Sequence, residues 1–345
     1  MCCLPRRTFL AGLAALGASA LFPRGEAAAQ APATGGAKTH RIDVHHHLLP
    51  PRLLAEVASR RVGERPPQWT PAKSVEEMDK SGIATSITSL IQPGVWFGDV
   101  AAGRRLAREC NDYAVQMVRD HPGRFGMFAA LPLPDAEGSL REIEYAVDVL
   151  KADGFGLMTS YGDKWLCDPA FTPVWEELNR RKAVVYTHPL APDCCRNLVR
   201  DVQTPTIEFA TDTTRTVASL LFSGTAARFP DIRFIFSHGG GTTPFLISRF
   251  IRQEATTKDR AQRLPQGVMY ELRKFYYETA QANHPMALAA LMKLAPVSNV
   301  LLGTDFPFRP GGEVIQGLAD YGFSAGDLRA IERENALRLL PRVKA

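Results

Sequence analysis

The chain has 345 residues, of which 45% are hydrophobic and 22% are charged, so it can bury an ordinary globular core. Its formal net charge is +5, and because residues 1–29 contain three arginines and one glutamate, the rest of the chain carries only +3. Such a small excess excludes strong attraction to nucleic acid or to an anionic membrane surface, and we expect neither as a partner.

The first 29 residues have the pattern of an export signal. Arg6 and Arg7 precede an apolar run over 9–22, and three alanines follow at 27–29. A basic region, a short apolar region and a small-residue cleavage site are typical of a secretory signal, and the paired arginines indicate the twin-arginine type. An uncleaved membrane anchor is the alternative, but the run is shorter than the ~20 residues that span a bilayer.

Residues 30–40 are rich in Ala, Gly, Pro and Thr, a composition that predicts a disordered leader. The sequence therefore divides into a twin-arginine-type signal peptide at 1–29, the leader at 30–40 and a folded domain at 41–345. We expect an exported, periplasmic protein with no stable membrane span once the signal is removed.

Three consecutive histidines, His45, His46 and His47, follow an apolar, strand-like segment at 42–44. Because successive side chains of a strand face opposite sides, His45 and His47 should share one face with Asp43, whereas His46 should face the other way. Two imidazoles on one face form half of a site for a zinc-like ion. A solvated turn or an expression tag is the alternative reading of the tract.

Strand-like and helical segments alternate after this opening strand. The stretch 50–70 combines a short helix with a Pro- and Arg-rich loop, and Ser74 is expected to cap a helix that ends at Gly82. Strands are predicted at 83–90, 124–131, 154–159, 183–187, 233–237, 274–279 and 299–304. Helices are predicted at 103–120, 138–151, 171–182, 206–229, 243–258, 285–294 and 324–340.

With the opening strand, the pattern gives eight strands, each followed by helical sequence. The strands are apolar enough to be buried on both faces, which indicates parallel pairing with right-handed crossovers. Eight such units close most simply into a (β/α)8 TIM barrel, here with a short insertion after strand one. An open doubly wound sheet is the alternative, but its first turn would normally be glycine-rich, whereas this turn holds histidines and prolines.

Polar residues gather where four of the predicted strands end. His45 and His47 end the first strand, His188 the fifth, His238 the sixth and Asp305 the eighth. Because catalytic groups of a barrel come from the C-terminal ends of its strands, these residues should meet at one mouth. Three histidines and one carboxylate suit a divalent ion, so we predict that His45, His47, His188 and Asp305 bind a metal. His238 is left for proton transfer or for support of a ligand.

The motifs at these strand ends resemble those of the amidohydrolase superfamily. They are His-x-His on strand one, His-Pro at 188–189, Ser-His-Gly-Gly-Gly at 237–241 and Gly-Thr-Asp-Phe-Pro-Phe at 303–308. More narrowly, they resemble its decarboxylase branch, which includes the aminocarboxymuconate-semialdehyde, resorcylate and methylsalicylate decarboxylases. The resemblance implies the same four metal ligands, with His238 as the acid/base residue.

The resemblance also implies a mode of substrate binding. Arg65 and Arg249 match carboxylate-binding arginines, the second of which reaches in from a neighbouring subunit and so implies a homodimer. A guanidinium offers a fork of donors to a carboxylate, although a solvated surface role is the alternative for both. Trp96, which follows the second strand, could stack on the substrate or simply pack.

The sequence thus predicts a metal-dependent, non-oxidative decarboxylase of a small aromatic or conjugated carboxylic acid, with His238 and Asp305 as catalytic residues. Residues 154–159 lack the lysine that binuclear members of the superfamily carboxylate, which implies one divalent metal, Zn²⁺ in the first place and Mn²⁺ as the alternative. No organic cofactor is expected. Hydrolysis of a lactone, amide or ester on the same site is the main alternative, and a non-catalytic periplasmic metal- or solute-binding protein is the third.

Other polar residues are assigned structural roles. Cys110 lies in a helical pattern and is expected to be a buried small hydrophobe. Cys194 and Cys195, in the loop after the fifth strand, are either free thiols or a vicinal disulfide. Glu278 and His284 flank the end of the seventh strand, and helix-start or surface roles are expected of both.

Overall fold

The computed structural model describes residues 41–60 and 66–343. The predicted signal peptide (1–29), the leader (30–40) and Arg65 lie outside these residues. The described residues belong to one compact unit. None of their helices combines the length and the apolar character needed to cross a membrane.

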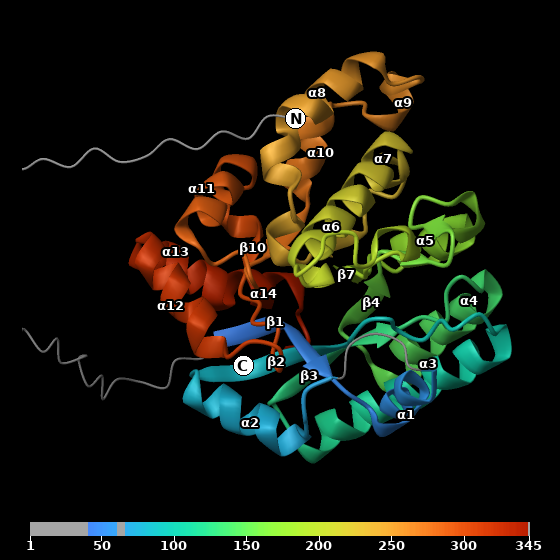
Figure 1. Cartoon of the computed structure of the whole chain (residues 1–345), viewed down its shortest axis with the longest axis vertical. Coiled ribbons are helices and arrows are strands. Elements are labelled where there is room, and N and C mark those ends of the chain that lie inside the picture. Colours follow the sequence, from blue (N-terminus) through green and yellow to red (C-terminus); the bar gives the residue numbers. More distant parts are fainter. Residues whose placement is uncertain (1–40, 61–65, 344–345) are drawn as a thin grey trace, which may run out of the picture. The chain divides into compact units, whose positions relative to one another are not determined.

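Eight parallel strands of the described chain form one sheet, paired in the order β1-β2-β3-β4-β7-β8-β9-β10 (Figure 1). Their bounds are β1 Arg41–Leu48, β2 Ile83–Leu90, β3 Phe125–Ala130, β4 Gly154–Met158, β7 Val184–His188, β8 Arg233–Phe236, β9 Tyr276–Glu278 and β10 Val300–Leu301. The sheet closes where the Val44 amide donates to the Leu302 carbonyl at 2.9 Å and His46 forms a parallel bridge with Phe306. The predicted (β/α)8 barrel is confirmed.

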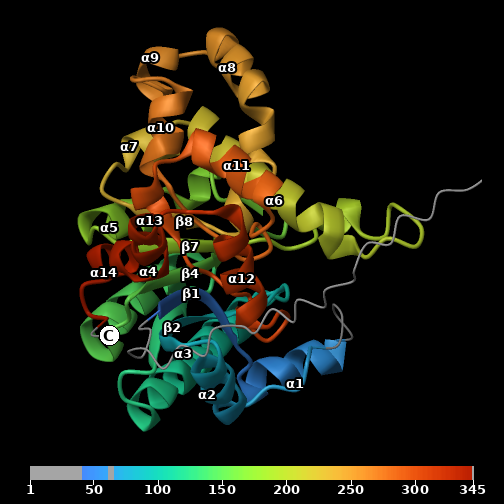
Figure 2. The same ribbon diagram turned by 90° about the vertical axis from the view of Figure 1, so that its left-hand side faces the viewer.

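Helices pack around the outside of the strands (Figures 1 and 2). They are α1 Pro51–Arg60, α2 Pro71–Lys80, α3 Val100–Asp120, α4 Ala136–Glu144, α5 Thr172–Arg180, α6 Thr204–Phe222, α7 Thr225–Arg228, α8 Ile247–Thr256, α9 Arg260–Arg263, α10 Val268–Lys274, α11 Pro285–Leu294, α12 Gly311–Tyr321, α13 Ala325–Arg329 and α14 Asn335–Leu339. The helices α1 and α2 form the predicted insertion after the first strand. A short hairpin, β5 Ser160–Tyr161 and β6 Lys164–Trp165, follows β4.

Several helical assignments differ from the sequence prediction, and the short helices α9 and α10 were not predicted. Helix α2 begins earlier than expected, because Thr70 caps it by accepting from the Lys73 amide at 3.2 Å and Pro71 occupies the first turn. Ser74, the predicted cap, is instead a buried residue inside the helix. Helix α12 was not predicted, because its glycine-rich start lacks the usual signals of a helix N-terminus.

The core lies in two layers. Between the sheet and the helices, large side chains such as Trp175 and Phe171 are fully buried. Inside the barrel a smaller apolar cluster fills the space between the strands, with members that include Ile42, Val44, Ile87, Phe128, Tyr186, Ile235 and Leu301. Burial of each large apolar side chain stabilises the fold by roughly 1.5–3 kcal/mol. The barrel is therefore a packed core, and its strand ends provide a rigid base for polar side chains.

The first strand contains an irregularity that changes one expectation. Its register against β2 shifts between Asp43 and His46, so the strict alternation of faces fails there. The buried Asp43 carboxylate accepts from the His46 ring at 3.0 Å and from the Thr304 hydroxyl at 2.6 Å. The prediction that Asp43 joins the face of His45 and His47 is therefore wrong. Asp43 instead links the first strand to the segment after the last.

Candidate metal centre and active site

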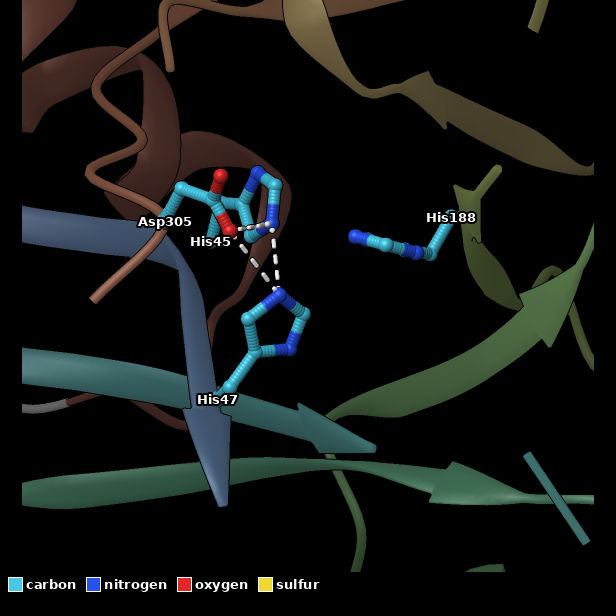
Figure 3. A group of neighbouring side chains, drawn as sticks. All are labelled: His45, His47, His188 and Asp305. Carbon is cyan, nitrogen blue, oxygen red and sulfur yellow. Dashed lines mark hydrogen bonds and ion pairs between the residues drawn. The ribbon is translucent and has the colours of Figure 1, made fainter. Parts of the chain in front are cut away.

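Four side chains converge at the carboxyl ends of three strands. His45 and His47 come from β1, His188 ends β7, and Asp305 follows β10; their ligand atoms all lie within 4.8 Å of one another (Figure 3). His45 Nε2 lies 3.1 Å from His47 Nε2, and Asp305 Oδ1 lies 3.3 Å and 3.0 Å from these two nitrogens. All four residues are buried. The structure thus brings together the four predicted ligands.

The remaining ring nitrogens explain why the Nε2 atoms are the ones that converge. His45 Nδ1 faces Glu278 Oε1 at 2.9 Å, His188 Nδ1 faces the Pro189 carbonyl at 2.7 Å, and His47 Nδ1 faces the Ser89 carbonyl at 3.4 Å. Each Nδ1 can donate its hydrogen to that oxygen, which leaves Nε2 as the lone-pair nitrogen.

Zinc–nitrogen bonds of about 2.0–2.1 Å at tetrahedral angles place ligand atoms roughly 3.3 Å apart, close to the separations among His45, His47 and Asp305. Three imidazoles and one carboxylate are also ligand types that such an ion accepts. The donor set therefore fits one divalent ion.

Burial and charge set the proton affinities of the three histidines. Burial lowers the pKa of His45, but the carboxylates of Glu278 and Asp305 outweigh it and raise that pKa to about 10. Burial lowers the pKa of His47, and burial with the charges of the neighbouring imidazoles holds the pKa of His188 well below its usual value. In the metal-free cluster His45 is therefore protonated on both ring nitrogens at neutral pH, whereas His47 and His188 are neutral.

Asp305 is held ionised within the cluster. Burial raises the pKa of this carboxyl, but the charge of His45 and the hydrogen bonds from the histidines keep it well below its usual range. Gln281 also donates to its Oδ2. Asp305 has a φ of +65°, in the left-handed region that non-glycine residues rarely adopt. Such backbone strain is common at functional sites.

His238 stands beside the cluster with its ring unpaired. Its Nε2 lies 3.7 Å from Asp305 Oδ2, and neither ring nitrogen has a hydrogen-bond partner among the described residues. Its ring stacks on Phe209 at 6.3 Å with an angle of 19° between the planes. His238 and the following Gly239, Gly240 and Gly241 all have positive φ, a turn that three glycines make accessible. A buried imidazole with free nitrogens is available to exchange a proton with a ligand.

Glu278 is the residue that sequence reasoning misplaced. Its side chain is fully buried and accepts from His45 Nδ1, from the His238 amide at 2.5 Å and from the Ala280 amide at 2.6 Å. A Cβ at Gly303 would overlap Glu278 Oε2, so glycine at 303 permits this approach. The expected surface or helix-start role of Glu278 is wrong. Its position at the end of β9 could have revealed this role, because functional groups of a barrel lie at the C-terminal ends of its strands, and that rule had selected the other site residues.

Two further expectations for this region are confirmed. His46 points away from the cluster, where its ring bonds to Asp43 and to Ser74 Oγ at 2.9 Å. His284 is exposed and caps α11 by accepting from the Met286 amide at 3.3 Å. The histidine triplet is therefore divided between the metal centre and the packing of β1 against α2.

A cavity of about 560 Å³ opens onto the cluster. His188 and Asp305 form part of its wall, together with apolar side chains, three glutamines, one threonine and one arginine: Val57, Pro66, Pro67, Ile91, Gln92, Gln203, Pro205, Thr206, Phe209, Gln281, Pro307, Phe308 and Arg309. Phe308 packs edge-on against His47 with ring centres 5.6 Å apart. Flat apolar walls beside a polar floor suit a small planar ligand.

Of the predicted substrate residues, Trp96 and Arg249 do not line this cavity, and Arg65 lies outside the described residues. Trp96 and Phe97 line a neighbouring hollow with Arg60. Arg249 is exposed on α8, which projects away from the barrel strands (Figure 2). The substrate roles of Trp96, Arg65 and Arg249 stay predictions.

The cysteines of the described chain are free thiols, one of them buried. Cys110 is 1% exposed within α3, as predicted, and burial raises the pKa of its thiol to about 12. Cys194 and Cys195 are free thiols in the loop after β7, with sulfur atoms 2.7 Å apart. Of the two predicted alternatives, free thiols and a vicinal disulfide, the structure contains the free thiols.

A closed parallel barrel with a buried histidine and aspartate cluster at its strand ends defines a (β/α)8 protein with a candidate metal centre where the active sites of this fold lie. A family model described as Amidohydrolase matches residues 42–342. The chain belongs to the amidohydrolase family, as its motifs predicted.

Similar proteins of known name are decarboxylases. The chain is 37% identical over 326 residues to Decarboxylase yanB of Aspergillus niger, with 88% of each chain covered. It is 34% identical over 316 residues to 6-methylsalicylic acid decarboxylase of Penicillium expansum, which covers 88% of this chain and 97% of that protein.

Solved structures share the fold. One described as an amidohydrolase II has a TM-score of 0.81 at 28% identity and covers 88% of this chain and 100% of its own. A dihydroxybenzoic acid decarboxylase from Polaromonas sp. JS666, determined with bound manganese and the inhibitor 2-nitroresorcinol, has a TM-score of 0.77 at 24% identity and covers 89% of this chain and 98% of its own.

Metal binding should release a proton from His45. Because the carboxylates raise the pKa of His45 to about 10, its Nε2 is protonated below that pH in the metal-free protein, and a metal must displace this proton. Metal affinity should therefore rise by about tenfold per pH unit between pH 7 and 9. Calorimetric titration at pH 7 in buffers of different ionisation enthalpy should show release of about one proton per ion. Metal binding without proton release would contradict the assigned protonation.

The Glu278→Gln substitution should weaken metal binding. Glutamine can still accept a hydrogen bond from His45, but it lacks the charge that increases the basicity of that ligand, so affinity should fall by about 10- to 100-fold. Competition with a chelating indicator would measure this. The matched control is Glu137→Gln, an exposed residue whose side chain is 67% accessible, which should leave affinity unchanged. Equal metal affinities of the Glu278→Gln and Glu137→Gln variants would show that Glu278 does not support the metal ligands.

Proposed function

We propose that this chain is a metal-dependent decarboxylase of a small aromatic carboxylic acid. The observation that carries the proposal is the His238 ring, which makes no hydrogen bond among the described residues, beside a buried His/Asp cluster whose His188 and Asp305 line a cavity with aromatic walls. The chain also spans most of the length of 6-methylsalicylic acid decarboxylase, at 34% identity. An acid bound between these walls would lie against Asp305, whose carboxylate is 3.7 Å from His238 Nε2.

The reaction replaces a carboxylate with a proton. A bound divalent ion would act as a Lewis acid that fixes and polarises oxygen atoms of the acid. His238 then donates a proton to the ring carbon that bears the carboxylate. The bond between that carbon and the carboxylate breaks, its electrons return to the ring, and carbon dioxide leaves. Asp305, 3.7 Å from His238 Nε2, stabilises the protonated imidazole before transfer.

One metal ion and no organic cofactor are enough for this chemistry. We assign His45, His47, His188 and Asp305 as ligands and place Zn²⁺ first, because three imidazoles and one carboxylate suit it. Manganese is the alternative, which its presence in the related Polaromonas enzyme supports. Elemental analysis of the purified protein identifies which metal is bound. A fully active preparation without bound metal would contradict both the zinc and the manganese assignment.

The acid would be oriented by Arg65, Trp96 and, from the second subunit of a homodimer, Arg249. This assignment rests on the motif resemblance and on the fit of a guanidinium to a carboxylate. Arg249 is exposed on α8, as a residue that serves a partner subunit must be. Light scattering on the purified protein measures the oligomeric state, and a monomer that turns over normally would exclude the role of Arg249.

The hydrolase alternative uses the same ligands, and a binding protein without turnover would use them too. The decarboxylases among the relatives favour carbon dioxide release over both. A screen of hydroxybenzoates and muconate-like acids for carbon dioxide tests the proposal directly. Release of an alcohol or amine from lactones, esters or amides, with no gas from any acid, would assign a hydrolase instead.

The His238→Asn variant should lose decarboxylation and keep its metal. Asparagine cannot transfer a proton, so kcat should fall by about 10²- to 10⁴-fold, the range that general acid catalysis supplies. Elemental analysis should give the same metal content as the parent protein, since His238 is not a proposed ligand. Gas release measured on the best acid gives kcat. The control His121→Asn, on the distant end of α3, should leave the rate unchanged.

We also propose that the protein reaches the periplasm through a twin-arginine-type signal at 1–29. The paired Arg6 and Arg7, the apolar run at 9–22 and the alanines at 27–29 support this assignment. In a bacterial host that exports such substrates, the periplasmic fraction should contain a chain that begins near residue 30. Replacement of Arg6 and Arg7 by lysine should retain the protein in the cytoplasm. Exported protein that still begins at Met1 would contradict cleavage.

A further inference from the structure

The proposed function leaves Arg309 without a role, although it is part of the cavity wall. Arg309 is the only lysine or arginine among the described residues that line the cavity. The other described lining residues are apolar side chains, three glutamines, one threonine, one histidine and the anionic Asp305. Among the described side chains of the wall, Arg309 is therefore the one that offers a guanidinium to an entering anion.

Arg309 and Asp305 lie at different depths in the cavity wall. The Asp305 side chain is 5% exposed, whereas the Arg309 side chain is 51% exposed. The two residues are joined by a single turn, in which the Arg309 amide donates to the Asp305 carbonyl at 3.3 Å. The same turn thus places a carboxylate at the floor and a guanidinium at the mouth.

The guanidinium is weakly engaged by the protein itself. Its ion pair within the described chain is with Glu313, where Arg309 Nη1 lies 3.6 Å from Oε1, longer than a hydrogen bond. Glu313 is also about half exposed, and such surface pairs are weak and screened by salt. The donors of Arg309 are therefore available to a ligand carboxylate, which a guanidinium binds through two parallel hydrogen bonds.

We infer that Arg309 distinguishes the acid substrate from its decarboxylated product. The inference rests on the proposed function. The substrate carries a carboxylate that the guanidinium attracts as the acid enters the cavity and before it reaches the metal centre, whereas the product has lost that charge. Arg309 thus strengthens binding of the acid, and the chemical step beside His238 does not depend on it.

The test compares Arg309→Gln and Arg309→Lys with the parent enzyme on a hydroxybenzoate that it decarboxylates. With Gln, kcat/KM should fall at least about tenfold through KM, while kcat stays within about threefold. The inhibition constant of the phenol product should stay within about twofold. The Lys variant should restore part of kcat/KM, because lysine keeps the positive charge but lacks the paired donors with which a guanidinium binds a carboxylate. Added salt should lower kcat/KM of the parent enzyme and not of the Gln variant.

A matched control is Arg119→Gln, an exposed residue of α3, which should change none of these constants. A tenfold fall in kcat at unchanged KM would overturn the inference, and so would a parallel loss of phenol binding or an unchanged kcat/KM.

The role of Arg309 can be tested even if the protein is not a decarboxylase. If the parent protein releases no carbon dioxide from any acid, calorimetric titration of the metal-loaded protein with salicylate and with phenol still tests Arg309. Weaker binding of salicylate alone in Arg309→Gln would support anion recognition, whereas equal salicylate affinity in both proteins would overturn it.

Discussion

The candidate site depends on the backbone pairing that closes the barrel. The Asp305 amide donates to the His45 carbonyl at 2.8 Å, and the His47 amide donates to the Phe306 carbonyl at 2.8 Å. These two bonds fix the register between the first strand and the segment after the last, and so hold the Asp305 carboxylate between two imidazole nitrogens. A slip of one residue would turn these side chains to the opposite face. Closure of the fold and assembly of the ligand set are thus the same event.

Burying so many ionisable groups is costly unless they balance one another. The cluster combines three imidazoles with Asp305, and Glu278 lies behind His45 at 2.9 Å. The two carboxylates retain a proton on His45 that a metal ion displaces, so the same groups stabilise the metal-free and metal-loaded forms. Glu278 also accepts from the His238 amide, so one carboxylate orients both His45, a proposed metal ligand, and His238, the proposed proton donor. The candidate metal centre and the proposed proton donor therefore depend on the same side chain.

The cavity adds a gradient of polarity to this centre. Its floor holds His188 and Asp305, its walls are aromatic at Phe209 and Phe308, and its mouth carries Arg309. In the proposed reaction an aromatic acid would be attracted by the charge of Arg309 and desolvated between the walls, where loss of carbon dioxide would remove a charge. A neutral product would then leave a site that no longer attracts it. The proposed chemistry and the proposed order of binding and release follow from the same arrangement.

The sequence by itself determined the eight-fold alternation of strand and helix, the family, and which histidines and which aspartate could act together, because strand parity and strand ends are local properties. Only the tertiary structure revealed the role of Glu278, whose partner His45 lies 233 positions away along the chain. The bulge that turns Asp43 to His46 and the placement of Arg309 on the cavity wall were also decided by packing. These features depend on contacts between distant segments, which periodicity and motif spacing along one chain do not encode.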